Sequence, residues 1–141
     1  MKARLIIATL VVAVIVQAAA AAAPVRYVIG VGVWQSGGRV STLEMVGLNP
    51  QPEPPSLTAL AIYTSGASVV KIKITCAKVP QPGTYVATGR GTNGRFYLIK
   101  IVNLSTGRGG DRVGVASLAV PPSPCAETPT VPLLAGDFFV H

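Results

Sequence analysis

The segment VVKIKITCAK, residues Val69–Lys78, alternates apolar and polar side chains over nearly its whole length. A period of two residues is that of a β-strand. One apolar face and one polar face are typical of an antiparallel sheet with one side in water. We therefore predict a strand in which one set of side chains points to a core (Val70, Ile72, Ile74 and Cys76) and the other points to solvent (Lys71, Lys73 and Thr75).

Short runs of β-branched and aromatic residues continue on both sides of this segment, separated by clusters of Gly, Pro, Asn and Ser. Seven or eight short strands at this spacing are typical of a sandwich or a small barrel. We predict an all-β domain, built as a small antiparallel β-sandwich. Its expected strands are Val25–Trp34, Arg39–Leu48, Leu57–Thr64, Val69–Lys78, Thr84–Thr88, Phe96–Leu104 and Val113–Val120, with a short edge strand at Phe138–Val140.

The first expected strand, Val25–Trp34, carries a pair of glycines. Tyr27, Ile29 and Val31 share one face, while Gly30 and Gly32 fall on the other. Glycine in a strand predicts a bulge or a close approach of a neighbouring backbone.

Residues 1–22 have the pattern of a secretory signal peptide. Lys2 and Arg4 precede the apolar run Leu5–Val16, and the small residues Ala18–Ala23 offer several A-x-A cleavage registers. We predict cleavage near Ala22, a single domain over residues 23–141, and a secreted, periplasmic or cell-envelope location. The alternative is a retained membrane anchor over Leu5–Ala23, which is just long enough to span a bilayer.

Cys76 and Cys125 are the two cysteines of the chain. In an exported protein an even pair of cysteines predicts a disulfide bond. This disulfide would close a loop of about 50 residues.

Removal of Lys2 and Arg4 with the signal peptide leaves ten Lys and Arg against five Asp and Glu. This excess makes basic residues candidates for contacting an anionic polymer or a cell-surface component: Lys71, Lys73, Arg90, Arg95, Arg108 and Arg112. In a simple meander, however, the loops that carry the arginines lie at opposite ends of Phe96–Leu104, so they form no single patch. The alternative is a solvated surface with lysines that guard the sheet edges. Few aromatic residues lie between the basic ones, so we expect no specific nucleic-acid binding.

Two further segments are rich in proline. Residues 49–56, NPQPEPPS, carry Pro50, Pro52, Pro54 and Pro55, which exclude a helix or a central strand and favour an extended path. This segment is a candidate for docking in an aromatic-lined groove, but we favour a stiff crossover between strands. Residues 121–132 are expected to be irregular.

The run Gly89–Gly94 matches G-x-G-x-x-G, the fingerprint of dinucleotide binding. That fingerprint requires a following helix, whereas Phe96 begins a predicted strand. We therefore predict a hairpin, with Asn93 and Gly94 supplying the positive φ angles of a tight turn.

Catalytic and metal-binding residues are sparse. The chain's single His is His141, and its five acids are scattered along the sequence. Zinc sites need Cys and His, calcium sites need clustered carboxylates, and a Ser or Cys nucleophile needs a base. We expect no metal, no cofactor and no enzyme activity.

The predicted function is that of a non-catalytic binding or structural module, with an unknown protein or an anionic polymer as partner. Two alternatives are a small hydrolase with two carboxylates and a fibre subunit that donates the strand Ala23–Trp34 to a neighbour. A carbohydrate or peptide ligand is expected if four aromatic residues converge on a surface pocket: Trp34, Tyr63, Tyr85 and Tyr97.

Overall fold

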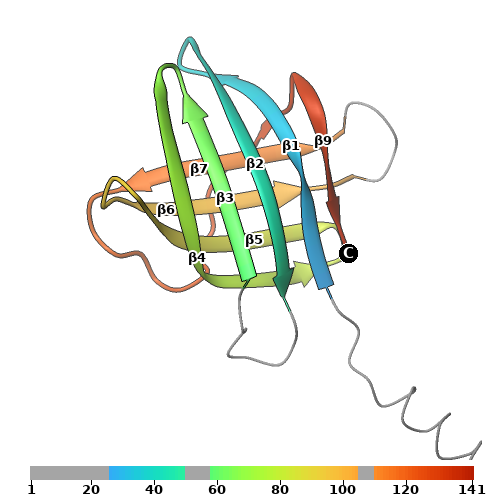
Figure 1. The fold of residues 1–141 in the computed structure, drawn as a ribbon. Helices are drawn as coiled ribbons and strands as arrows, with labels where there is room; N and C mark the ends of the chain where they lie inside the picture. Colours follow the sequence, from blue (N-terminus) through green and yellow to red (C-terminus); the bar gives the residue numbers. More distant parts are fainter. Residues whose placement is uncertain (1–25, 50–57, 105–109) are drawn as a thin grey trace, which may run out of the picture.

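The computed structural model describes residues 26–49, 58–104 and 110–141. These ranges form one curled antiparallel sheet (Figure 1). Its strands are β1 (Arg26–Ser36), β2 (Arg39–Asn49), β3 (Thr58–Ser65), β4 (Ser68–Gln81), β5 (Thr84–Gly91), β6 (Phe96–Val102), β7 (Arg112–Leu118), β8 (Val131–Pro132) and β9 (Ala135–Val140). The prediction of an antiparallel all-β domain is confirmed.

Several predictions from the sequence concern residues outside the described ranges. They are the signal peptide, Arg108 and the prolines of the expected crossover, namely Pro50, Pro52, Pro54 and Pro55. In the described part of the chain, no helix has the length and apolar character that crossing a membrane requires.

The strands lie in the order β8-β7-β6-β5-β4-β3-β2-β1-β9. In Figure 1, β1 to β3 run steeply through the view, β5 to β7 cross behind them, and β4 bends from the first direction into the second. The expected division into two separate sheets is not what the structure shows. The reason is β4, which pairs with β3 through residues 68–73 and with β5 through residues 72–81, so that one sheet turns the corner without a break.

A β-bulge in β4 marks this corner. The pairing of β4 with β5 shifts register between Ile74 and Cys76, and such a shift bends a strand and changes which side chains face inward. Ile74 before the shift and Ala77 after it both belong to the buried core cluster, whereas Cys76 does not. The prediction that Cys76 points to the core is therefore wrong, because the alternation reverses at the bulge.

The C-terminal segment joins the two ends of the sheet. β8 pairs with β7 and β9 pairs with β1, and only Leu133 and Leu134 separate these two short strands. The Leu133 N–H donates to the Asp111 main-chain oxygen (3.1 Å), and the Leu134 N–H donates to that of Val33 (2.7 Å). One continuous stretch of chain thus links the strand at one end of the meander to the strand at the other.

We call the place where β8 and β9 link the two ends of the sheet the seam, and the Asp111 side chain lies in it. Its carboxylate accepts hydrogen bonds from the Phe138 N–H (2.9 Å) and the Leu104 N–H (3.3 Å). Asp111 itself is only 6% exposed. The carboxylate satisfies two backbone donors that have no neighbouring strand at this point, and a buried donor left unpaired costs about 1–3 kcal/mol.

Phe138 of β9 fills the interior beside β1 and is fully buried. A Cβ at Gly32 would overlap its ring, and a Cβ at Gly30 would overlap the backbone of Asp137 and Phe138. The expectation that this glycine pair allows a close approach is confirmed, and the neighbour includes an aromatic ring as well as a backbone.

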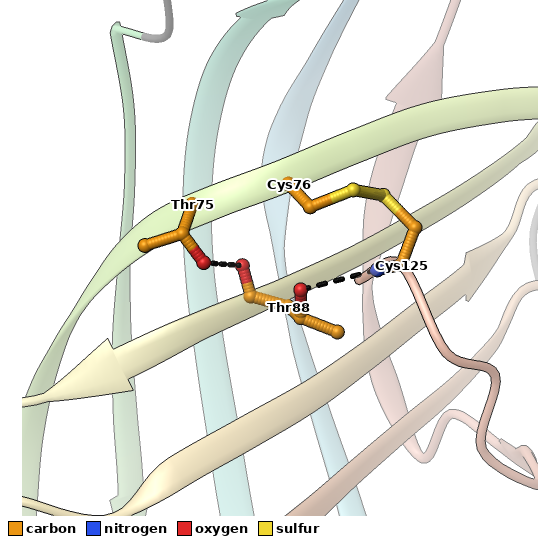
Figure 2. Close-up of a disulfide and its surroundings, with 4 residues drawn as sticks. All are labelled: Thr75, Cys76, Thr88 and Cys125. Carbon is orange, nitrogen blue, oxygen red and sulfur yellow. Dashed lines mark hydrogen bonds between the residues drawn. A yellow bond between two sulfur atoms is a disulfide. The ribbon is translucent and has the colours of Figure 1, made fainter. Parts of the chain in front are cut away.

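Residues 119–130, which we call the strap, cover the outer face of the sheet from β4 to β7. Cys125 is bonded to Cys76 of β4, and its N–H donates to Thr88 Oγ1 of β5 (3.2 Å), as Figure 2 shows. Thr75 Oγ1 in turn donates to the Thr88 main-chain oxygen (3.2 Å). The predicted disulfide is therefore present, and it fixes the strap to the outside of the sheet.

The strap has further contacts along β6 and β7. Lys100 Nζ lies 3.2 Å from Glu127 Oε2. A Cβ at Gly114 would overlap the main-chain oxygen of Pro129, so the strap lies directly on the backbone of β7. Because of this cover β5 is buried on both faces, and both Val86 and Thr88 are shielded from solvent.

Replacement of Cys76 and Cys125 by alanine should lower the free energy of unfolding by about 4 kcal/mol, because the cross-link closes a loop of about 50 residues in the unfolded chain. Urea unfolding of the oxidised protein and of the double variant measures this difference. In the double variant, amide hydrogen exchange should be faster than in the oxidised protein. This increase should be larger at residues 119–130 and at Val86 than in β1 and β2. Equal stability of the two proteins would contradict the structural role of this bond.

Candidate functional site

The basic residues predicted from the sequence are only partly brought together. Lys71 and Lys73 are exposed on β4, and Arg90 of β5 is paired opposite Lys73. The Arg90 guanidinium carbon also lies 5.7 Å from the centre of the Phe96 ring, which is within cation–π distance. These three residues form one basic group on the outside of the corner between β4 and β5.

The side chains of Arg95 and Arg112, the other two described arginines of the predicted set, form hydrogen bonds within the protein. Arg95 Nε donates to Ser117 Oγ (2.6 Å), and Arg112 donates through Nη2 to the Thr130 main-chain oxygen (2.8 Å). Phe96 pairs with Leu118 and Val102 pairs with Arg112, so Arg95 and Arg112 lie at opposite ends of the β6–β7 pair. The expectation that these arginines form no single patch is confirmed for the residues that the structure describes.

The run Gly89–Gly94 forms part of a β-hairpin, as predicted. The Gly91 N–H donates to the Arg95 main-chain oxygen (2.9 Å), and Gly94 has a positive φ of 81°. Asn93 does not share this positive φ. Its side chain instead donates to the Tyr97 hydroxyl (2.8 Å) and accepts from the Arg95 N–H (3.1 Å).

The four aromatic residues named from the sequence form no surface pocket. Trp34 and Tyr63 stack with ring centres 6.0 Å apart, and Tyr63 meets Tyr97 edge-on at 5.9 Å. Trp34, Tyr85 and Tyr97 are buried in the core, with Tyr63 packed against it. These rings stabilise the interior, so they do not support the carbohydrate or peptide ligand that depended on their convergence.

Tyr85 carries the one buried side-chain polar atom that has no hydrogen-bond partner in the described part of the chain, its hydroxyl oxygen. Burial raises the pKa of this phenol well above its usual range, which keeps the group neutral at any physiological pH. It is poorly suited to act as a base.

The sequence interpretation missed an apolar surface on the outside of β1, β2, β3 and β9. We call it the apolar face, and it consists of Ile29, Val31, Val46, Leu60, Ile62 and Phe139. Val46 is 53% exposed and Phe139 is 57% exposed. Most of these side chains line a shallow hollow of about 470 Å³. Contiguous exposed apolar surface of this kind marks interaction sites on soluble proteins.

Strand register arranges this surface in two rows. One row runs Phe139, Ile29, Val46, Leu60, Lys73 and Arg90 from β9 to β5. The next row runs Asp137, Val31, Glu44, Ile62 and Lys71 from β9 to β4. The apolar face therefore has acids toward its β9 side and within it at β2, and lysines along its β4 side.

Asp137, at the acidic side, also contacts the seam. Its side chain hydrogen-bonds Asp111, and this bond, together with desolvation and the charge of Asp111, raises the pKa of Asp137 above its ordinary value of 3.8. The Phe138 backbone acts in the opposite direction. The two carboxyls, 26 positions apart in sequence, could not be recognised as a pair from spacing alone. In the described ranges no three His, Cys, Asp or Glu side chains gather closely enough to hold a metal ion.

Comparison of the chain with models of protein families, with curated proteins and with solved structures found no match. The chemistry of the apolar face and its charged borders is therefore the basis for assigning a function.

The raised pKa of Asp137 predicts a pH-dependent stability. The folded protein binds the proton of the Asp137 carboxyl more tightly than the unfolded chain does. The protonated carboxyl therefore stabilises the folded protein below pH 4, and this stabilisation is lost as the pH rises through the raised pKa. The variant Asp137→Asn keeps an N–H donor toward Asp111 without a charge. Its melting temperature should exceed that of the wild type at pH 7, and the two should converge toward pH 3.

Glu127→Gln serves as the control for Asp137→Asn, because it removes an equal charge from a surface carboxylate whose ion-pair partner is Lys100 and not Asp111. It should show no rise at pH 7. An Asp137→Asn variant that is less stable than the wild type at pH 7 would contradict the carboxyl pair.

Proposed function

We propose that the chain is an exported, non-catalytic binding module whose binding surface is the apolar face. The observation that carries this proposal is the position of that surface. Val46 and Leu60 are about half exposed although they lie on central strands of the sheet. A partner that covers them gains hydrophobic free energy without reorganising the backbone, because the strands already fix their positions.

Export is supported by two features that are far apart in the chain. The N-terminal residues have the charge and apolar pattern of a signal peptide. The bond between Cys76 and Cys125 suits an oxidising compartment.

The basic group of Lys71, Lys73 and Arg90 extends the proposed surface along one side. It provides electrostatic attraction for an acidic region of a partner, such as an acidic protein surface or an anionic polymer. The apolar face supplies contact area, and the basic group favours one orientation of the partner.

The two alternatives from the sequence receive less support. Among the residues that the structure describes, Asp111 and Asp137 are the candidate pair for a carboxylate-dependent hydrolase. Asp111, however, already accepts two backbone N–H groups. Loss of a hydrolytic activity in Asp137→Asn without loss of stability would favour it. Donation of β1 to a neighbouring subunit would break two ladders, because β1 pairs with both β2 and β9.

Export can be tested on the full chain. When the chain is produced in cells, the protein outside the cytoplasm should begin near Ala23 and weigh two hydrogens less than its reduced form. The variant Lys2→Glu/Arg4→Glu should stay inside the cell, because a signal peptide requires a positive n-region. Recovery of the intact, uncleaved chain from the membrane fraction would support the retained anchor instead.

The binding surface can be mapped by NMR with 2-propanol as a small apolar probe. Amide shifts should be largest at Val46, Leu60 and Ile62. Val120 and Leu134 provide the internal control, because they are 67% and 65% exposed but lie outside the apolar face. Equal shifts at the control residues, or shifts centred on the strap, would contradict the proposal.

A further inference from the structure

We propose that the partner of the apolar face is a second copy of this chain, packed face to face about a two-fold axis. The inference rests on the proposed function of the apolar face as a binding surface. It adds the identity and orientation of the partner, both of which follow from the order of charges across the strands.

The order of charges in the row Asp137, Val31, Glu44, Ile62 and Lys71 is not symmetric, with acids toward β9 and β2 and a lysine at β4. A two-fold axis parallel to the strands and midway between β2 and β3 places β3 of one copy over β2 of the other. The same axis places β4 over β1. Every contact between a residue of the first copy and a residue of the second is thus repeated with the two copies interchanged, as an isologous interface requires.

This arrangement matches the charges. Lys71 of the second copy lies over Val31 and therefore between Asp137 and Glu44 of the first, and the symmetric contact repeats on the other side of the axis. In the neighbouring row, Leu60 of each copy lies over Val46 of the other. Val46 and Leu60 of the two copies therefore form an apolar row at the centre. In the row of Lys71, this side chain of each copy lies between two acids of the other, and these four opposite-charge contacts outweigh the single contact of the two Glu44 side chains across the axis and fix the register of the two copies.

The same charges disfavour a membrane surface as the partner. A face that binds anionic lipids needs apolar and basic residues, and Lys71, Lys73 and Arg90 supply the basic part. Glu44, however, lies in the middle of the face, paired with Val31 on one side and Ile62 on the other. A second copy places a cation near this carboxylate, whereas an anionic bilayer does not.

The size of the face suits a weak, reversible dimer. Strands about 4.8 Å apart, and three residues per strand about 3.3 Å apart, give a face of roughly 24 Å by 10 Å across β9 to β4. That is on the order of 250 Å² per copy, which is below the area that stable specific interfaces bury. We therefore expect a dissociation constant on the order of 100 micromolar.

The test is sedimentation velocity of the exported, disulfide-bonded protein across a concentration series. The wild type should shift from monomer to dimer. Glu44→Lys and Lys71→Glu should each weaken the dimer by about tenfold or more, because each places like charges opposite one another in both symmetric contacts. Arg39→Glu changes a charge equally at the β1–β2 turn, outside the apolar face, and should leave the dimer intact.

Mixing the two weakened variants is the decisive experiment. In a mixed pair, Lys71 of the Glu44→Lys chain meets Glu44 of the Lys71→Glu chain, and the introduced lysine meets the introduced glutamate. At a concentration where each variant alone is monomeric, dimers should return in the mixture. A folding defect cannot produce this recovery, so a mixture that stays monomeric would overturn the proposal.

The remaining outcomes separate this inference from the function on which it rests. A wild type that is monomeric at 1 mM (a concentration well above the expected constant) would overturn the dimer. If 2-propanol still maps to the apolar face, the binding surface stands with a different partner. Co-sedimentation of the monomer with phosphatidylglycerol vesicles, abolished by Lys71→Glu, would identify that partner as an anionic membrane and would also overturn the dimer.

Discussion

The curled sheet depends on the ten residues from Val131 to Val140, which pair with β7 at one end and with β1 at the other. Without them, two strands would have unpaired backbone groups, and such edges invite pairing with other chains. Asp111 makes this closure specific, because its buried carboxylate accepts N–H groups from both sides of the seam. Phe138 adds the hydrophobic part, and the glycines of β1 provide the space that its ring needs. The side chains of the apolar face point outward because the opposite face of the same strands is packed against the interior.

Much of the strand content follows from local patterns. The alternation through Ile74 and the glycine pair in β1 both predicted features that the structure contains. Features that depend on pairing between distant strands could not be predicted from these local patterns. The bulge after Ile74 reverses the alternation of buried and exposed side chains, and no residue type at that position predicts a bulge. One curled sheet and two stacked sheets need the same strands, and the difference lies in how β4 divides its pairing between β3 and β5.

The candidate site was less accessible from the sequence. β1 is apolar on both faces, since Val28 and Trp34 face the core while Ile29 and Val31 face outward. Periodicity alone cannot tell which set is buried, and burial had to come from the position of Phe138. The lysines of β4 were recognised, but their relation to Glu44 depends on the register of β2 and β3 between them. The meeting of Asp111 and Asp137 likewise needs the closed sheet.

The closure also has a consequence for the order of folding. β1 and β9 are about a hundred residues apart in the chain, so their ladder contributes strongly to a high contact order, and folds of that kind form slowly. The hairpins from β1 to β7 connect near neighbours and can form earlier. A chain synthesised or translocated from its N-terminus therefore passes through a stage with both sheet edges exposed, until its last strand arrives. Chaperones have most to protect in that interval, and oxidation of Cys76 and Cys125 cannot hold the strap in place before β5 lies beneath it.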